Sequence, residues 1–425
     1  MGRNIFFHID INSAFLSMEA AYRTKVLGNV FDLRTVPSVI AGSKADRHGI
    51  ILAKSIPCKK YGITTGEPIG MALSKCPELI VEGANYELYV EASRHFVEIL
   101  KEYTDDVEQY SIDECWLNMS GIPEIERIPV LLAHEIKDRI KNEMDLTVNV
   151  GVSENKLLAK MAGDFSKPNK VHTLFPNEIE KKMWPLPVSD LFGVGYATTK
   201  KLDGLGILTI GELANTDLNI LHSHLKSQAD VLIAFANGIS FSDIGFIPSS
   251  VGVSRYNKGY GNSYTIPVDV ADSETAHQVI LSLCETVASR MRADVAYGSV
   301  VVISIRYNNL LGFSHQLPIK NPTDATSEIY KYAVKCFDEA WNKALPVRKI
   351  GVRMTRITNQ RIRQYDMFEG DLFERMSAVD HVIDDIRLRY GENAIIRARF
   401  AKSQISAMSG GVSKDRRTGP IGTVV

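Results

Sequence analysis

Hydrophobic residues along the chain follow both of the spacings that mark regular structure, so strands and helices are both predicted. Residues 4–11 form an almost continuous apolar run, which predicts a buried strand at the start of the chain. Apolar residues recur every three or four positions between Tyr89 and Tyr103, as on one face of a helix. The same two patterns predict further helices near 130–140, 156–161, 273–292, 324–344 and 372–390, and further strands at 38–42, 49–53, 147–152, 299–306 and 348–357.

A strand–turn–strand is predicted around residues 107–119, where aromatic and β-branched residues flank two adjacent carboxylates. These carboxylates are Asp113 and Glu114, between Ile112 and Cys115. Adjacent side chains on a strand point to opposite faces, so both can reach one site only at a turn or at the end of a strand. A solvated hairpin tip with two acidic residues is the simpler interpretation of the pair by itself.

A third carboxylate, Asp10, lies at the end of the strand predicted for residues 4–11. An aspartate in such a position is usually a cap or a turn residue. Three carboxylates at the ends of apolar strands are instead the hard oxygen ligands that Mg²⁺ prefers, together with water and phosphate. We therefore expect Asp10 to meet Asp113 and Glu114 in space, although their spacing along the chain does not require it.

The residues around these carboxylates resemble the two catalytic motifs of the Y-family, the translesion DNA polymerases. The first motif comprises His8–Phe15 and Ser17–Glu19, and the second comprises Ser111–Glu114. The resemblance extends over nearly the whole chain and favours the bacterial polymerase IV and polymerase V group. It implies two Mg²⁺ ions held by the three carboxylates and the Ile11 carbonyl, and in-line nucleotidyl transfer from a dNTP to a primer 3′-hydroxyl.

A chain of 425 residues suits two to four domains. The order strand–helix–strand–strand–helix–strand predicts an α+β palm with one layer of helices. The resemblance implies a multidomain right-hand polymerase with a ferredoxin-like palm. Its parts would be palm at 1–20 and 86–175, small fingers at 21–85, a helical thumb at 176–240, a tether at 241–252, an α/β little finger at 253–358 and a C-terminal tail at 359–425.

Three residues match family positions that contact the incoming nucleotide. Phe15 stands five residues after the first carboxylate, where the family carries the aromatic that blocks a ribose 2′-hydroxyl, although a phenylalanine by itself is usually a core residue. Lys167 matches the family's triphosphate-binding lysine. Lys59 stands where the family often has an arginine, and solvated surface is its simpler interpretation. The chain departs from the family at Ala14 and Ile56, where an aromatic and a tyrosine are common.

The resemblance places DNA contacts in the thumb and in the little finger. Gly193 and Gly195 resemble the glycine turn of a helix–hairpin–helix, whose backbone N–H groups meet a phosphate, although tight helix turns need glycine in any case. Arg306, Arg353 and Arg356 lie on predicted strands, and an ordinary surface arginine is the equal alternative. The net charge is −1, while residues 253–358 carry 13 Lys and Arg against 9 Asp and Glu, a balance compatible with modest DNA affinity.

Gln364, Tyr365, Met367 and Phe368 resemble the peptide that docks into the bacterial sliding clamp. Tyr365 and Met367 stand where leucines are common, and a match of five residues also occurs by chance. The position of this peptide just after the last DNA-binding domain favours clamp docking.

Composition agrees with a globular protein of the cytoplasm. Hydrophobic residues make up 45% and charged residues 23% of the chain. No apolar run approaches the roughly 20 residues of a membrane helix, so no membrane contact is expected, and no export signal is visible. Five cysteines without metal-ligand spacing favour a reducing cytoplasm over a disulfide framework or a zinc site.

Together these features predict a template-directed, low-fidelity DNA polymerase for translesion synthesis, acting on primer–template DNA and dNTPs. A non-catalytic scaffold that binds DNA and the clamp on the same fold is the competing hypothesis, but relatives that have lost activity usually lack part of the carboxylate set. A nucleotide cyclase with a palm fold is a third hypothesis, and the DNA-binding segments count against it.

Overall fold

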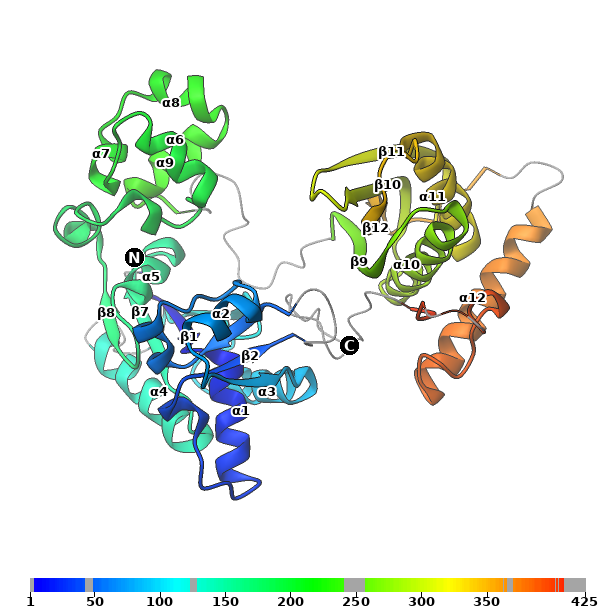
Figure 1. Cartoon of the computed structure of the whole chain (residues 1–425). Coiled ribbons are helices and arrows are strands. Elements are labelled where there is room, and N and C mark those ends of the chain that lie inside the picture. The colour runs from blue at the N-terminus through cyan, green and yellow to red at the C-terminus, as the bar shows by residue number, and fades with distance from the viewer. Residues whose placement is uncertain are drawn as a thin grey trace. The chain divides into compact units, whose positions relative to one another are not determined.

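The chain is seen here in a computed structural model, which describes residues 4–42, 49–122, 128–240, 257–361, 363–364, 370–401, 403 and 405–408. These residues form two compact units. Unit 1 comprises the described residues up to 240, and unit 2 comprises those from 257 onward (Figure 1).

Unit 1 is built on a five-stranded sheet. Its strands are β1 (Phe6–Ile11), β5 (Val107–Gln109), β6 (Glu114–Asn118), β7 (Val148–Ser153) and β8 (Val171–Thr173). They lie in the order β5-β6-β1-β7-β8, and β1 pairs antiparallel with both of its neighbours. The apolar run at the start of the chain is therefore the middle strand, as its composition indicates.

Helices cover both faces of this sheet. They are α1 (Ala14–Lys25), α3 (Tyr86–Lys101), α4 (Pro129–Met144) and α5 (Lys156–Asp164). Phe7 and Ile9 of β1 share one core with α1, α3 and α4, whereas the intervening His8 lies beside Gly163 of α5. The prediction of one helical layer is therefore wrong, because the order of elements does not reveal the face to which a helix returns.

A smaller three-stranded sheet, in the order β3-β2-β4, has its own core. It comprises β2 (Ser38–Ala41), β3 (Ile51–Lys54) and β4 (Ile80–Gly83), with α2 (Ile69–Lys75) and the 3₁₀ turns η1 (Leu33–Thr35) and η2 (Ile56–Tyr61). Arg23, near the end of α1, binds both carboxylate oxygens of Glu82 in β4, at 3.0 and 2.9 Å. The boundary expected between residues 20 and 21 thus falls inside α1, because buried Ala20 and Ala21 continue the helix.

The last part of unit 1 is helical. It comprises the short turns η3 (Pro176–Glu178), η4 (Ile179–Met183) and η5 (Val188–Asp190), followed by α6 (Tyr196–Asp203), α7 (Ile210–Ala214), α8 (Leu218–Leu225) and α9 (Gln228–Ala236). Leu157 and Met161 of α5 belong to the same hydrophobic core as these helices. Helix α5 therefore packs on the five-stranded sheet and on the helical part at once.

Unit 2 is a four-stranded antiparallel sheet with two helices packed on one face. It comprises β9 (Gly259–Val270), β10 (Tyr297–Tyr307), β11 (Gly312–Thr323), β12 (Val347–Thr358), α10 (Ser273–Ala293) and α11 (Thr326–Ala340), and the strands lie in the order β11-β10-β12-β9. Strands β9 and β11 were not predicted. Both are rich in polar residues and contain proline (Pro267 and Pro318), and they form because β10 and β12 offer hydrogen-bonding edges.

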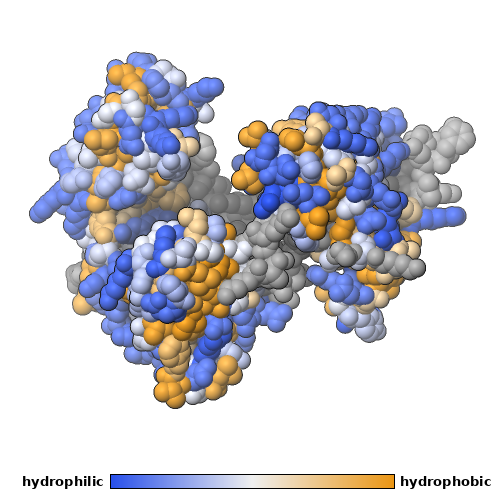
Figure 2. Space-filling view, viewed as in Figure 1, coloured by the Kyte–Doolittle hydropathy of each residue, from blue (hydrophilic) through white to orange (hydrophobic). Residues whose placement is uncertain are grey.

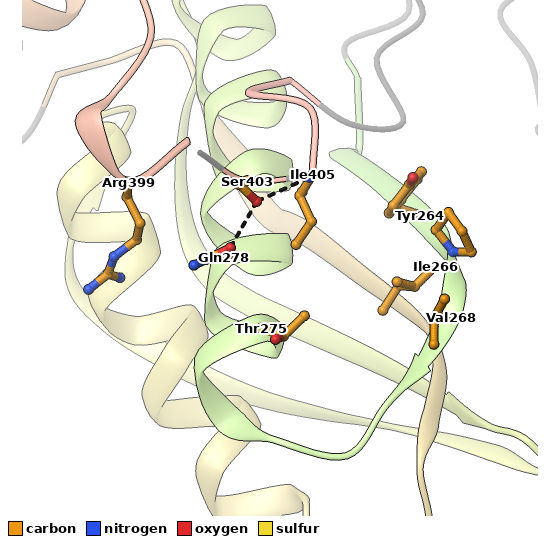
Figure 3. A pocket seen from close by; sticks show the side chains of 9 residues that line it. Tyr264, Ile266, Val268, Thr275, Gln278, Arg399, Ser403 and Ile405 are labelled. Atoms are coloured by element: carbon orange, nitrogen blue, oxygen red, sulfur yellow. Dashed lines mark hydrogen bonds between the residues drawn. The ribbon is translucent and has the colours of Figure 1, made fainter. Parts of the chain in front are cut away.

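The chain beyond β12 also packs on unit 2. Helix α12 (Gly370–Tyr390) lies against α10, and η6 (Ala398–Phe400) buries Phe400 against the same helix. The Ser403 hydroxyl donates to Gln278 Oε1 at 3.0 Å (Figure 3). The segment after α12 lines a pocket of about 410 Å³ together with β9 and α10. The expected tail thus contains a segment that is part of unit 2.

Among the described residues, no helix is long and apolar enough to span a membrane. On the face shown in Figure 2, hydrophobic areas of different sizes lie among hydrophilic ones. The exposed large apolar residues include Val26, Leu27, Val30 and Phe31, which follow α1 in the chain.

Gly151→Ala is expected to destabilise unit 1 by about 3 kcal/mol, the upper part of the range for overpacking a core. A Cβ at Gly151 of β7 would stand 1.9 Å from the Ala159 carbonyl oxygen in α5. Chemical denaturation of the full chain measures the change. Gly70→Ala in α2 is the matched control, since its Cβ would meet no atom within 4 Å and alanine favours a helix by about 1 kcal/mol. A Gly151→Ala protein as stable as the wild type would contradict this close packing.

Candidate active site

Strands β1 and β6 bring two of the expected carboxylates together. In their antiparallel register, Asp10 lies directly opposite Glu114. Asp113 stands in the turn just before β6, and its carbonyl accepts a hydrogen bond from the Ile11 N–H at 3.0 Å. Because Asp113 is in a turn, strand alternation does not force it away from Glu114. All three carboxylates therefore belong to the same end of β1 and β6.

Burial dominates the electrostatics of this group. Burial raises the pKa of Asp10, while Lys167 opposes the increase and Glu114 adds to it. Burial likewise raises the pKa of Asp113, where the hydrogen bond from Ser111 Oγ, at 2.5 Å, opposes the increase and Asp10 adds to it. Negative charges that are poorly solvated and close together favour a cationic ligand.

Lys167 partly balances this charge. It forms an ion pair with Asp10 and a second, at 2.9 Å, with Asp164 at the end of α5. Burial lowers the pKa of Lys167, but these two carboxylates raise it by more. The structure thus places the expected triphosphate lysine directly beside the first carboxylate.

Lys160 on α5 was not predicted as a site residue, yet its Nζ donates to Glu114 Oε1 at 2.9 Å. It is only 8% exposed, and its Nζ lies 5.8 Å from the ring centroid of Tyr110 and 5.5 Å from that of Phe192. A lysine within the apolar run of residues 157–163 is the sequence signal that could have revealed it, because a buried ammonium needs an anionic partner.

His8 flanks the other oxygen of Glu114. Its Nε2 lies 3.9 Å from Glu114 Oε2, and its ring centroid lies 5.3 Å from that of Trp116. Burial lowers the pKa of His8 well below its usual value, with Lys160 and Lys167 acting in the same direction, so the ring is neutral. Neither ring nitrogen has a hydrogen-bond partner among the described residues. The carboxylate of Glu114 thus lies between the ammonium of Lys160 and the neutral imidazole of His8.

The three carboxylates are the candidate ligands for a divalent cation. In the parts of the chain that the structure describes, no three His, Cys, Asp or Glu side chains form a ready-made metal site. Two of the oxygens that a cation would need, on Asp10 and Glu114, are paired with Lys167 and Lys160. The donor set nevertheless fits Mg²⁺, since all its members are hard oxygens and Mg²⁺ completes its shell with water and substrate phosphates.

Phe15 lies in the first turn of α1, directly after the strand that carries Asp10. Its ring stacks on Tyr89, with 4.7 Å between centroids and 13° between planes, and meets the edge of Tyr86 at 6.0 Å. The preceding Ala14 is buried. Packing against two tyrosines fixes the position of the Phe15 ring close to the carboxylate end of β1.

Lys59 is exposed on η2, and its side chain makes no hydrogen bond or ion pair with the described residues. Ile56, on the same turn, is 53% exposed. The structure therefore does not bring Lys59 into contact with the carboxylates, in contrast to Lys167.

The two glycines of the expected helix–hairpin–helix precede α6. Gly193 has a φ of +89°, a conformation that favours glycine, and Gly195 is the N-cap of α6. Tyr196, the first residue of α6, is 77% exposed, and Lys200 Nζ lies 4.6 Å from its ring centroid. This helix start therefore exposes backbone next to an aromatic ring and a cation.

Two of the three expected arginines share one face of the unit 2 sheet. Ile305 and Val352 point into the core, so the neighbouring Arg306 and Arg353 point to the opposite face, where both are exposed. Arg356 differs, because its φ of +51° is a left-handed backbone conformation inside β12, between Thr355 and Ile357, which keep one register with β10. The structure thus groups Arg306 with Arg353 and sets Arg356 at an irregular point of the sheet.

Gln364, the first residue of the expected clamp peptide, is exposed and held through its backbone. Its N–H donates to Asn321 Oδ1 at 3.1 Å, and its carbonyl accepts from Asn321 Nδ2 at 3.3 Å. Tyr365, Met367 and Phe368 lie outside the described residues.

Comparison with known proteins finds relatives that match most of the chain. The impB/mucB/samB family matches residues 9–164, its C-terminal domain matches residues 257–367, and the IMS family HHH motif matches residues 176–207. DNA polymerase IV of Clostridium acetobutylicum is 41% identical over 401 residues, which cover 93% of this chain and 97% of that relative. DNA polymerase IV of Acetivibrio thermocellus is 36% identical over 397 residues, which again cover 93% and 97%.

Solved structures share the fold. A Y-family DNA polymerase chimera superposes with a TM-score of 0.68 at 24% identity, over 83% of this chain and 99% of that chain. An insertion ternary complex of the Dbh DNA polymerase superposes with a TM-score of 0.55 at 24% identity, over 83% and 98%. At this identity the likeness concerns the fold, and it confirms the multidomain α+β right-hand architecture expected from the sequence.

A sheet that presents three carboxylates at one end, joined to a helical part and to a second sheet unit, defines a right-hand polymerase. The chain belongs to the Y-family of translesion DNA polymerases, in the DNA polymerase IV group, and is a DNA-directed DNA polymerase.

Lys160→Met is expected to lower the rate of single-turnover primer extension by about tenfold or more. Without this ammonium Glu114, an expected catalytic carboxylate, would lose its ion-pair partner, and a misplacement of 1 Å in a catalytic group can cost on the order of 100-fold. Lys156→Met is the matched control, because Lys156 lies on the same helix and pairs with Glu108 at 2.6 Å. Loss of that pair is expected to change the rate by no more than about twofold. Equal losses in both variants would assign the effect to the stability of α5.

Proposed function

We propose that this polymerase performs template-directed, low-fidelity synthesis past lesions, joining dNTPs to a primer 3′-hydroxyl at its three carboxylates. The register that sets Asp10 opposite Glu114, with Asp113 in the adjoining turn, supports this most directly. The whole carboxylate set of the family motifs is present, which argues against a scaffold without catalysis. The similarity to DNA polymerase IV relatives over 93% of the chain supports the same conclusion.

In this proposal two Mg²⁺ ions are held by Asp10, Asp113, Glu114 and the Ile11 carbonyl. Bound there, the ions would activate the primer hydroxyl and stabilise the charge on the leaving pyrophosphate. The chain itself contributes by holding these oxygens in place before the substrate binds. Such preorganised positioning and electrostatic stabilisation supply much of the rate enhancement in enzymes.

The two lysines have different roles in this proposal. The Lys167 side chain is 37% exposed, so its ammonium can leave Asp10 and pair with the triphosphate of a nucleotide without being left uncompensated. The Lys160 side chain is 10% exposed and has no such alternative, so it stays beside Glu114 and orients it. Asp10 thus becomes available when a triphosphate binds, whereas Glu114 remains in one position.

Phe15 and Lys59 complete the nucleotide site. The Phe15 ring, fixed by Tyr89 and Tyr86, blocks a ribose 2′-hydroxyl. The side chain of Lys59 is exposed and has no partner among the described residues, so it can meet a triphosphate without losing an ion pair.

The DNA contacts lie in two places. Gly193 and Gly195 offer backbone N–H groups to a phosphate at the start of α6. Arg306 and Arg353, on the open face of the unit 2 sheet, and Arg356 at its irregular point meet further phosphates. Such contacts carry affinity without reading sequence, as bypass of varied lesions requires.

We further propose that Gln364, Tyr365, Met367 and Phe368 dock into the sliding clamp. The exposed side chain of Gln364, on a backbone held by Asn321, supports this. All five cysteines are free and buried, which suits the reducing cytoplasm in which we place the protein.

Asp113→Asn is expected to reduce primer extension to background while primer–template binding, measured by fluorescence anisotropy, is retained. Burial raises the pKa of Asp113, so at neutral pH its charge opposes folding, and the neutral amide removes that penalty. The thermal midpoint of the metal-free protein is therefore expected to rise by about 2 °C.

Asp32→Asn is the control for this experiment. Burial acts to raise the pKa of Asp32, but its hydrogen bonds with Arg34 lower it overall, so removing that charge is expected to lower the midpoint and leave extension intact. Extension by Asp113→Asn at the wild-type rate would refute the proposed site.

Phe15→Ala is expected to raise ribonucleotide incorporation by about 10- to 200-fold, the range in which steric exclusion of one small group operates. The ratio of single-nucleotide insertion efficiencies for an NTP and the matching dNTP measures this. Phe15→Tyr keeps the ring and is expected to keep the discrimination. If both variants discriminate as the wild type does, the phenylalanine is a core residue and not the steric gate.

A further inference from the structure

Helix α12 buries polar and charged side chains against the rest of unit 2. Ser377, Asp380 and Arg387 on this helix are buried, with exposed fractions of 7%, 4% and 7%. An amphipathic helix on a protein surface normally buries its apolar stripe. Helix α12 instead buries these three residues and leaves apolar residues exposed together with charged ones.

Buried ion pairs hold α12 in this orientation. Arg292 of α10 pairs with Asp384 at 2.6 Å and with Asp380 at 3.4 Å. Arg387 pairs with Glu285 of α10 at 2.6 Å. Removing one partner from such a pair is strongly unfavourable, so a rotation of α12 about its axis would leave buried charges uncompensated. The ion pairs therefore specify which side of the helix faces outward.

The outward side carries an apolar stripe. It consists of Met376, Val379, Val382, Ile383, Ile386 and Tyr390, and we refer to it as the outer stripe. Val379, Val382 and Tyr390 are 54%, 57% and 75% exposed. Steps of three and four residues are those by which a helix docks along its length onto another surface. Exposed apolar surface that the fold itself orients outward marks an interaction site.

The expected clamp peptide, Gln364–Phe368, lies between two points fixed on unit 2. On one side, Arg363 pairs with Glu328 of α11 at 2.9 Å, next to the backbone of Gln364 that Asn321 holds. On the other side α12 begins at Gly370, two residues after Phe368, which is at most about 7 Å of chain. A clamp bound to the peptide therefore lies beside the start of α12.

We propose that the outer stripe of α12 makes a second contact with the sliding clamp. This proposal rests on the proposed docking of Gln364–Phe368 into the clamp. Val379 is nine residues into the helix, about 14 Å along its axis, so a clamp held by the peptide is within reach of the stripe. Arg375, within the stripe, and Arg389, at its edge, are exposed cations, and Glu374 and Asp385 are exposed acidic residues on the same helix. A contact tethered by a first one acts at high effective concentration, so a modest apolar area suffices.

The test substitutes Val379→Glu together with Val382→Glu in the full chain and measures the Kd for the purified clamp by calorimetry. Affinity is expected to fall about tenfold or more, equivalent to about 1.4 kcal/mol. Leu388→Glu is the matched control. Leu388 is 73% exposed and lies half a turn of helix away from Val379, so its substitution is expected to change affinity by no more than about twofold. Unchanged thermal unfolding and unchanged extension without the clamp exclude misfolding.

A peptide variant, Gln364→Ala with Phe368→Ala, separates this proposal from the one on which it rests. If that variant keeps wild-type affinity, docking through the peptide is wrong and the second contact falls with it. If it loses the clamp while the double variant at Val379 and Val382 binds as the wild type does, only the second contact is overturned. Self-association that the double variant abolishes, with clamp affinity unchanged, would assign the stripe to a second copy of the chain.

Discussion

The pairing of β1 with β6 in a single register is the constraint on which the site in unit 1 depends. A slip of one residue would move Asp10 away from Glu114 and would turn Phe7 and Ile9 from the core toward α5. Burial of these apolar side chains is therefore what aligns the two carboxylates. The hydrophobic effect is not directional by itself. Because successive side chains on a strand point to opposite faces of the sheet, burying the apolar residues on one face also fixes the positions of the charged residues on the other.

That alignment has an electrostatic cost, and α5 supplies most of the compensation. Lys160 lies within this helix and Lys167 follows it, and they pair with Glu114 and with Asp10. The position of α5 in turn depends on Gly151, where any side chain would meet the helix backbone. The absence of a side chain at Gly151 of β7 thus lets α5 approach the sheet closely enough to bring the cations to the carboxylates on β1 and β6.

Unit 2 uses buried charge for a different purpose. Its apolar core lies between the sheet and the helices α10 and α11, and α12 contacts α10 without contributing to that core. Arg292 and Arg387 instead hold that helix by ion pairs, which are directional where apolar contacts are not. The outward side is left free to carry apolar residues.

By itself the sequence determined the buried strand at residues 4–11, the carboxylate hairpin and the Y-family resemblance, because each is encoded within a short window. Only the tertiary structure decided on which face α5 lies, that β9 and β11 are strands, and which side of α12 is buried. The pair of Lys160 with Glu114 joins residues 46 positions apart. Such pairings depend on how elements pack, and no local periodicity carries that information.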